Sequence, residues 1–113
     1  MEGLISGDVV ILPFPFTDLQ REKSRPALIL GLSVEGSYNM SQITTPFQRG
    51  PHALPLERQD FLEGGFTKSS YVRVDMIFTI LPKRIKRKAG HVHSSYLAQV
   101  NKQLFEFLEL QRS

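Results

Sequence analysis

Residues 70–80 read SYVRVDMIFTI, and this long stretch is typical of a β-strand. Val, Ile, Tyr and Phe dominate it, and these residue types are enriched in strands. Two charged residues, Arg73 and Asp75, interrupt the stretch two positions apart. Side chains two apart in a strand point to the same face of the sheet. The stretch therefore predicts a strand that carries a cation and an anion together on one side.

Three earlier segments also favour strands. Residues 9–13 (VVILP) and 25–34 (RPALILGLSV) are short apolar runs of the kind that forms buried strands. Residues 38–47 (YNMSQITTPF) alternate roughly, which places Gln42 and Thr44 on the same face of a third strand. Strand-forming segments thus recur along the first half of the chain.

The connections are less regular. Residues 17–24 are polar and follow two prolines, so they predict a loop. Residues 48–69 are punctuated by Gly and Pro and predict at most one short strand, near Leu54–Leu56. Residues 81–92 (LPKRIKRKAGHV) predict a basic connector that contains a turn or a short strand.

The hydrophobic period changes at the end of the chain. Leu97, Val100 and Leu104 follow helical spacing, and Ser94 or Ser95 is a suitable residue to cap the start of a helix. We therefore expect a mainly β protein with a C-terminal α-helix, in which a small curled sheet or barrel is closed by that helix.

Bulk composition limits the class of protein. The 113 residues suit a single domain, 1–113, and the 41% hydrophobic content is that of a globular protein. The chain has no cysteine, which excludes disulfides, thiolate metal sites and cysteine nucleophiles. No apolar run approaches the ~20 residues that cross a bilayer, and the N-terminus lacks a basic signal segment. These features predict a soluble cytoplasmic protein with no membrane partner.

The net charge of +3 permits an anionic partner such as nucleic acid without requiring one. The basic run Lys83–Lys88 has two interpretations, a contact with a nucleic-acid backbone or a solvated connector. His91 and His93 share a face if their segment is extended, and His52 stands alone in a loop. No third metal ligand is evident from the spacing, which favours solvated histidines over a metal site.

Four residues are candidates for chemistry. Arg25 opens a strand before the rigid Pro26, which leaves its guanidinium group free to bind a phosphate or simply to lie in solvent. Thr44 is a hydroxyl donor on a strand, although threonine is also an ordinary strand former. Arg73 and Asp75 form either a solvated ion pair of little consequence or an acid–base and phosphate site on a rigid element.

Taken in order, three blocks resemble the MazF/PemK family of toxin endoribonucleases, also called mRNA interferases. These blocks are GDVVILPFPFTDLQREKSRPALIL, SQITTPF and SYVRVDMIFTI. The resemblance covers nearly the whole chain, and no single block is diagnostic by itself. It implies an SH3-like barrel of the PemK/MazF/CcdB type that ends in a helix and is generally a homodimer.

The resemblance also implies a function. Members of the family cleave single-stranded RNA sequence-selectively, without a metal or other cofactor, and are restrained by a cognate antitoxin. Carried over residue by residue, the Arg of Arg-Pro is Arg25 and the Thr of the third strand is Thr44, while the late strand contributes Arg73 and Asp75. The resemblance thus assigns these four residues to one cleavage site.

The chemistry of RNA cleavage suits that assignment. Attack by a 2′-hydroxyl on the neighbouring phosphate needs a base, and it needs positive charge over the phosphorane that develops. An arginine is a poor base because its pKa lies above about 12, so we assign the base to Asp75. Arg25 and Arg73 then stabilise the oxyanions and Thr44 donates a hydrogen bond. The expected products are a 2′,3′-cyclic phosphate and a 5′-hydroxyl.

One feature departs from the family. Some PemK-type toxins carry a histidine in the first loop, whereas residues 17–24 contain none, which leaves the acid for the leaving group unassigned. Asp18, Arg21 and Lys23 are candidates for RNA contacts in that loop. The alternative function is a non-catalytic binder, either a CcdB-like toxin that targets gyrase or a degenerate nucleic-acid-binding module.

Overall fold

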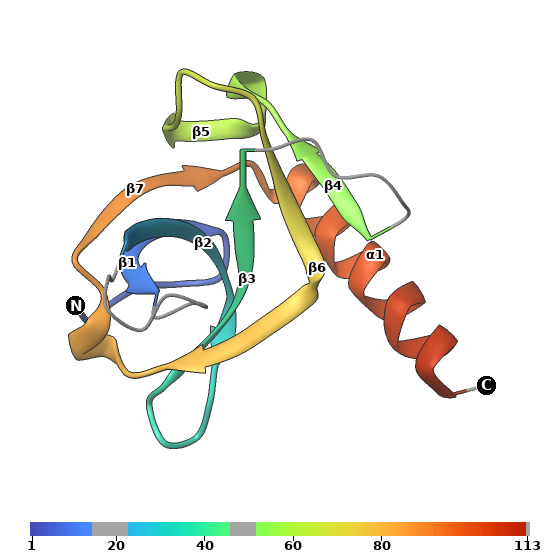
Figure 1. Cartoon of the computed structure of the whole chain (residues 1–113), viewed down its shortest axis with the longest axis horizontal. Coiled ribbons are helices and arrows are strands. Elements are labelled where there is room, and N and C mark those ends of the chain that lie inside the picture. The colour runs from blue at the N-terminus through green and yellow to red at the C-terminus, as the bar shows by residue number, and fades with distance from the viewer. Residues whose placement is uncertain (15–22, 46–51, 113) are drawn as a thin grey trace.

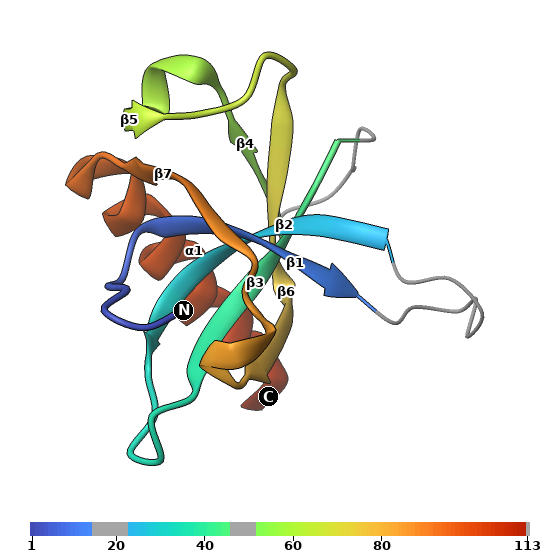
Figure 2. The same cartoon turned by 90° about the vertical axis from the view of Figure 1, so that its left-hand side faces the viewer.

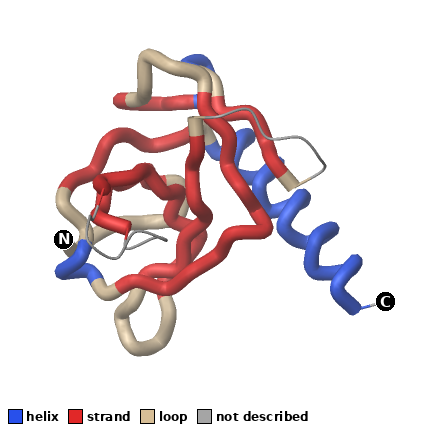
Figure 3. Tube along the Cα trace, viewed as in Figure 1, coloured by secondary structure: helices blue, strands red, loops and turns tan. Residues whose placement is uncertain are grey.

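The computed structural model describes residues 1–14, 23–45 and 52–112. Its core is one seven-stranded sheet with the strand order β4-β6-β3-β2-β1-β7-β5, in which every pairing is antiparallel. Figure 1 and Figure 3 show that the sheet curls on itself and that one long helix lies outside the curl. The elements are β1 (Asp8–Phe14), β2 (Lys23–Leu32), β3 (Tyr38–Thr44), β4 (Ala53–Leu56), the 3₁₀ helix η1 (Arg58–Asp60), β5 (Phe61–Gly64), β6 (Ser70–Ile80), the 3₁₀ helix η2 (Pro82–Arg84), β7 (Arg87–Val92) and α1 (Ser94–Arg112).

The architecture confirms the expected class, a mainly β protein with a C-terminal helix. Two details of the expectation were wrong. The segment between β3 and β6 holds two short strands, β4 and β5, where the sequence predicted at most one. Strand β2 begins at Lys23, so Arg25 and Pro26 lie inside the strand instead of opening it. The proline is tolerated at that position, where it lies opposite Ile11 of β1.

Two hydrophobic cores form because adjacent residues of each strand point to opposite faces of the sheet. Val9, Leu28 and Val72 lie on the outer face, where Tyr96 and Val100 of α1 cover them. Figures 1 and 2 show α1 running along this side of the sheet, next to β6. All five residues are at most 2% exposed, so the amphipathic helix is held by burial of its apolar stripe.

The second core fills the inside of the curl. Its buried members come from β1, β2, β3 and the chain that follows η2, namely Val10, Leu12, Phe14, Ala27, Ile29, Tyr38, Met40 and Ile85. These residues alternate with those of the outer core along the same strands. The alternation of buried side chains on both faces explains why residues 9–12 and 27–30 are apolar throughout.

The contact between β5 and β7 depends on two glycines. Gly64 has φ of 67°, and a Cβ added to it would lie 2.2 Å from the backbone oxygen of Ala89. Gly90 is equally close to the chain, because a Cβ there would lie 2.6 Å from the backbone oxygen of Glu63. A side chain at Gly64 is therefore excluded both by its backbone conformation and by the neighbouring strand.

A buried carboxylate ties the N-terminal segment to β7. Asp8 is 1% exposed, and its Oδ2 accepts a hydrogen bond from the backbone N–H of Ile5 at 2.8 Å. Its Oδ1 lies 2.8 Å from Nδ1 of His91 and 3.2 Å from Nζ of Lys88, and Lys88 also pairs with Glu63 at 3.0 Å. The sequence favoured a solvated His91, but this histidine has a structural partner in Asp8.

In the described part of the chain, no helix has an apolar stretch long enough to cross a membrane.

Candidate active site

The two charged residues of β6 form a direct ion pair. Arg73 donates two hydrogen bonds to Asp75, from Nε to Oδ1 at 3.2 Å and from Nη2 to Oδ2 at 2.8 Å. Their side chains are 30% and 28% exposed, so the pair is accessible from solvent while both residues are partly shielded. The expectation that they share a face is confirmed, and the two parallel hydrogen bonds fix the orientation of both groups.

A bulge in β6 presents this pair. Ser41 of β3 pairs with Ile77, and the next residue, Gln42, pairs with Arg73. Val74, Asp75 and Met76 therefore have no partner in β3. On the other edge of β6, next to its pairing with β4, the backbone N–H of Val74 donates to the carbonyl of His52 at 3.0 Å. Figure 1 shows β6 bending sharply partway along its length. Bulges of this kind redirect side chains and are common beside active sites.

The ion pair keeps Asp75 ionised. The hydrogen bond from Arg73 lowers the pKa of Asp75 below its ordinary value, and the positive charge of Arg73 adds to this effect, whereas partial burial opposes it. A smaller charge effect comes from His52, whose ring packs on Phe107 of α1 at 4.9 Å between centroids. At neutral pH, Asp75 is therefore a carboxylate that accepts hydrogen bonds or a proton.

The strand register places the other two candidates on the same face as the pair. Gln42 and Thr44 of β3 lie opposite Arg73 and Tyr71 of β6. Residues directly opposite one another in an antiparallel pair share a face of the sheet. Thr44 is therefore one strand away from Arg73 and two residues along, with a half-buried side chain.

The strand register also places Arg25 on this face of the sheet. Ala27 of β2 lies opposite Gln42, and Arg25 is two residues from Ala27 on an exposed position of the same strand. Arg25 thus lies on the strand beyond Thr44, at about two strand spacings, roughly 10 Å, from β6. Among the described residues, no hydrogen bond joins Arg25 or Thr44 to the Arg73–Asp75 pair. The structure brings Arg73 and Asp75 into contact and aligns Thr44 and Arg25 beside them.

The three residues proposed for RNA contacts fall in different places. Asp18 and Arg21 lie outside the described residues. Lys23 lies at the start of β2, opposite Phe14, and its side chain is exposed.

The remaining polar features of the sequence lie away from the ion pair. His91 contacts Asp8, and the backbone N–H of His93 donates to the carbonyl of Asp60. In the basic run, Lys86 donates from Nζ to Ser24 of β2 at 3.2 Å, and Lys88 contacts Asp8 and Glu63. Within residues 1–14, 23–45 and 52–112, no three His, Asp or Glu side chains lie close enough together to hold a metal ion.

Two neighbours of the site were not singled out from the sequence. Gln42 lies directly opposite Arg73, and the alternation of residues 38–47 already placed it on the face of Thr44. His52 is bonded through its carbonyl to the bulge of β6, and nothing in the sequence around a lone loop histidine indicates that contact.

Comparison with known proteins agrees with this fold. The family model described as PemK-like, MazF-like toxin of type II toxin–antitoxin system matches residues 5–108, which is almost the entire chain. The protein belongs to this family of PemK-like and MazF-like toxins. No curated protein matches the chain in a direct sequence comparison.

Solved structures of several toxins share the fold. A mycobacterial endoribonuclease in complex with its cognate antitoxin matches with a TM-score of 0.74 and 20% identity, over 96% of this chain and 97% of that one. MazE–MazF (Form-III) from Deinococcus radiodurans matches with a TM-score of 0.74 and 21% identity, over 96% and 98%. The Mycobacterium tuberculosis toxin MazF-mt6 matches with a TM-score of 0.69 and 20% identity, over 90% and 96%. At this level of identity, the likeness establishes the fold.

Proposed function

We propose that this chain is the toxin of a toxin–antitoxin pair and that it cleaves single-stranded RNA without a metal ion. One observation carries the proposal: the bidentate Arg73–Asp75 pair in the bulge of β6, on the face that also bears Thr44 and Arg25. A surface ion pair contributes little to the free energy of folding, so stability alone does not account for these two charges. A guanidinium and a carboxylate held together on a strand supply the charges that phosphoryl transfer to an internal hydroxyl requires.

The reaction follows from the roles of these groups. The Asp75 carboxylate accepts the proton of the ribose 2′-hydroxyl, and the 2′-oxygen forms a bond to the adjacent phosphorus. Arg73 and Arg25 stabilise the negative charge on the non-bridging oxygens, to which Thr44 donates a hydrogen bond. The bond from phosphorus to the 5′-oxygen then breaks, leaving a 2′,3′-cyclic phosphate and, once that oxygen takes up a proton, a 5′-hydroxyl. No described residue stands out by geometry as the donor of that proton.

The biological setting follows the family. One neighbour is an endoribonuclease described with its cognate antitoxin, and another is a MazE–MazF complex. We propose that this chain likewise binds a cognate antitoxin, forms a homodimer and acts on RNA in the cytoplasm. We treat residues 1–113 as one toxin domain.

The test is direct. Purified protein is incubated with a long single-stranded RNA in EDTA, and the new ends are mapped. We expect discrete cuts that leave a 2′,3′-cyclic phosphate and a 5′-hydroxyl. Intact RNA across many sequence contexts would refute the nuclease, and inhibition of gyrase supercoiling by the same preparation would favour the gyrase-directed alternative. Arg73→Ala is expected to abolish most of the cleavage and to leave the fold intact, whereas the control Arg58→Ala, at an exposed arginine of η1, should cleave like the parent.

A further inference from the structure

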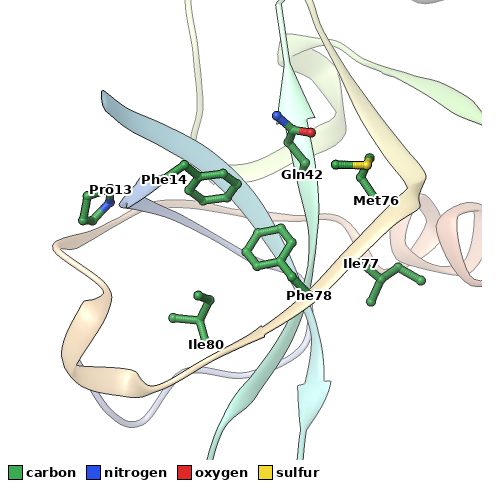
Figure 4. A pocket seen from close by; sticks show the side chains of 7 residues that line it. All are labelled: Pro13, Phe14, Gln42, Met76, Ile77, Phe78 and Ile80. Carbon is green, nitrogen blue, oxygen red and sulfur yellow. The ribbon is translucent and has the colours of Figure 1, made fainter. Parts of the chain in front are cut away.

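A small apolar pocket of about 210 Å³ is lined in part by Gln42, the cross-strand partner of Arg73, and by Met76, the residue after Asp75. Figure 4 shows the residues that line it, from β1, β3 and the second half of β6. They are Pro13, Phe14, Gln42, Met76, Ile77, Phe78 and Ile80. Only Phe14 among them is buried, at 6% exposure, so the pocket has a buried floor and an accessible rim.

Two aromatic rings form its centre. Phe14 and Phe78 pack edge to face, with their ring centroids 4.7 Å apart and an interplanar angle of 85°. Phe14 is fixed by the inner core, whereas Phe78 is half-buried and accessible from the pocket. A partly accessible aromatic ring of this kind can stack with a base of single-stranded RNA, because every base offers a flat face.

One hydrogen-bonding side chain lies among these apolar groups. Gln42 carries the only amide among the described residues that line the pocket. The amide is half-buried and forms no hydrogen bond with any other described side chain or backbone group. An amide has both donors and an acceptor, and an apolar pocket with one such group is the usual arrangement for orienting a flat polar ligand.

Two residues of the pocket are neighbours of the proposed cleavage site. Gln42 is the cross-strand partner of Arg73, and the two side chains therefore lie on one face of the sheet. Met76, which lines the pocket, directly follows Asp75. A phosphate held at Arg73 thus has its neighbouring nucleotide within reach of the pocket, since adjacent strands are about 4.8 Å apart.

We propose that this pocket binds the nucleobase next to the scissile phosphate, which stacks on Phe78 and is read by the Gln42 amide. The inference rests on the proposed function and adds a determinant of sequence preference to it. The favoured base is the one whose hydrogen-bond donor and acceptor are placed to pair with those of the Gln42 amide. The two rings supply stacking affinity that is independent of base identity.

The experiment measures base preference at the cut. The parent protein and its variants digest a single-stranded RNA library with randomised positions, and sequencing of the ends gives the ratio of favoured to least favoured base at each position. Gln42→Leu removes the hydrogen bonds while nearly preserving volume, and Phe78→Leu removes the ring. Gln99→Leu, an exposed glutamine of α1, is the matched control and retains the parent's preferences.

We expect Gln42→Leu to reduce the preference at one position flanking the cut by about tenfold while more distant positions keep theirs. Phe78→Leu is expected to raise KM, and thermal melting shows whether each variant is folded. An unchanged base preference in folded Gln42→Leu, or an unchanged KM in folded Phe78→Leu, would overturn the inference and leave the nuclease intact. No cleavage by the parent would refute the nuclease itself. A change in sedimentation of the variants, with base preference unchanged, would show that a second copy fills the pocket and would also overturn the inference.

Discussion

Asp8→Asn tests the claim that a buried, charged hydrogen-bond network attaches the N-terminal segment to β7. The substitution keeps the shape of the side chain and removes its charge. Hydrogen bonds to charged groups contribute about 1 kcal/mol more than neutral ones. Two of the hydrogen bonds are partly buried, those from the backbone N–H of Ile5 and from the ring of His91. In the variant, the amide NH2 group replaces one carboxylate oxygen, so its hydrogens point at one of these two donors. The contact with Lys88 is left out of the expected loss in stability, because 38% of its side chain is exposed and solvent screens its charge.

The expected loss in unfolding free energy is therefore about 2–3 kcal/mol, which corresponds to a fall in Tm of roughly 8–12 °C for a chain of this size. Chemical denaturation at pH 7 measures the free energy, and calorimetry measures the Tm. Glu35→Gln is the control, because it neutralises an exposed carboxylate and is expected to change stability by less than about 0.5 kcal/mol.

The pH dependence provides the sharper criterion. Burial alone would raise the pKa of Asp8, but the hydrogen bonds from Ile5, His91 and Lys88 outweigh it and hold the pKa below the ordinary value of 3.8. The carboxylate therefore stabilises the fold fully above pH 3.8, and this contribution is lost as the pH falls through the lower, folded pKa. The difference between the parent and Asp8→Asn should narrow in that acid range. A difference in unfolding free energy that is negligible at pH 7, or equal at every pH, would show that the charge of Asp8 does not stabilise the protein.

The other predictions concern the active site, a strand contact and the helix. Because Arg73 holds the pKa of Asp75 below its ordinary value of 3.8, kcat/KM of the parent should fall only at pH values more acid than this. Arg73→Lys should move this fall in kcat/KM to higher pH. A fall in kcat/KM of the parent near neutral pH would exclude Asp75 as the base. Gly64→Ala should cost at least about 1 kcal/mol in unfolding free energy, since its Cβ would meet Ala89, whereas wild-type stability in a urea melt would contradict the close packing of β5 on β7. Tyr96→Phe removes a hydrogen bond of 2.9 Å to the carbonyl of Pro55 and should cost about 1 kcal/mol. Burial raises the pKa of Tyr96, so it contributes stability below about pH 10 that is lost above it, and an unchanged alkaline unfolding curve in Tyr96→Phe would argue against this.

The sequence predicted most of the fold because its main signals are local. Apolar runs and alternation identified β1, β2, β3 and β6, and helical spacing identified α1. Strand β5 was missed because its four residues, FLEG, carry little pattern of their own, and their pairing depends on the close approach of Gly64 to β7.

The candidate site was predictable in part for the same reason. The contact between Arg73 and Asp75 follows from a spacing of two in a strand, and the structure confirms it, while their catalytic roles stay predictions. The bulge that presents them was not predictable, because it arises from the register of β6 against β3. Nor did local pattern reveal the partnership of Asp8 and His91, which are 83 residues apart in the chain.

The central claim is that the carboxylate of Asp75 takes the proton from the attacking hydroxyl. The most direct measurement is the single-turnover rate of RNA cleavage by Asp75→Asn in EDTA, with Glu106→Gln, an exposed position of α1, as the control. We predict a rate at least about 100-fold below that of the parent, with an unchanged circular dichroism spectrum. A folded Asp75→Asn protein that cleaves RNA at the parent's rate would contradict the account.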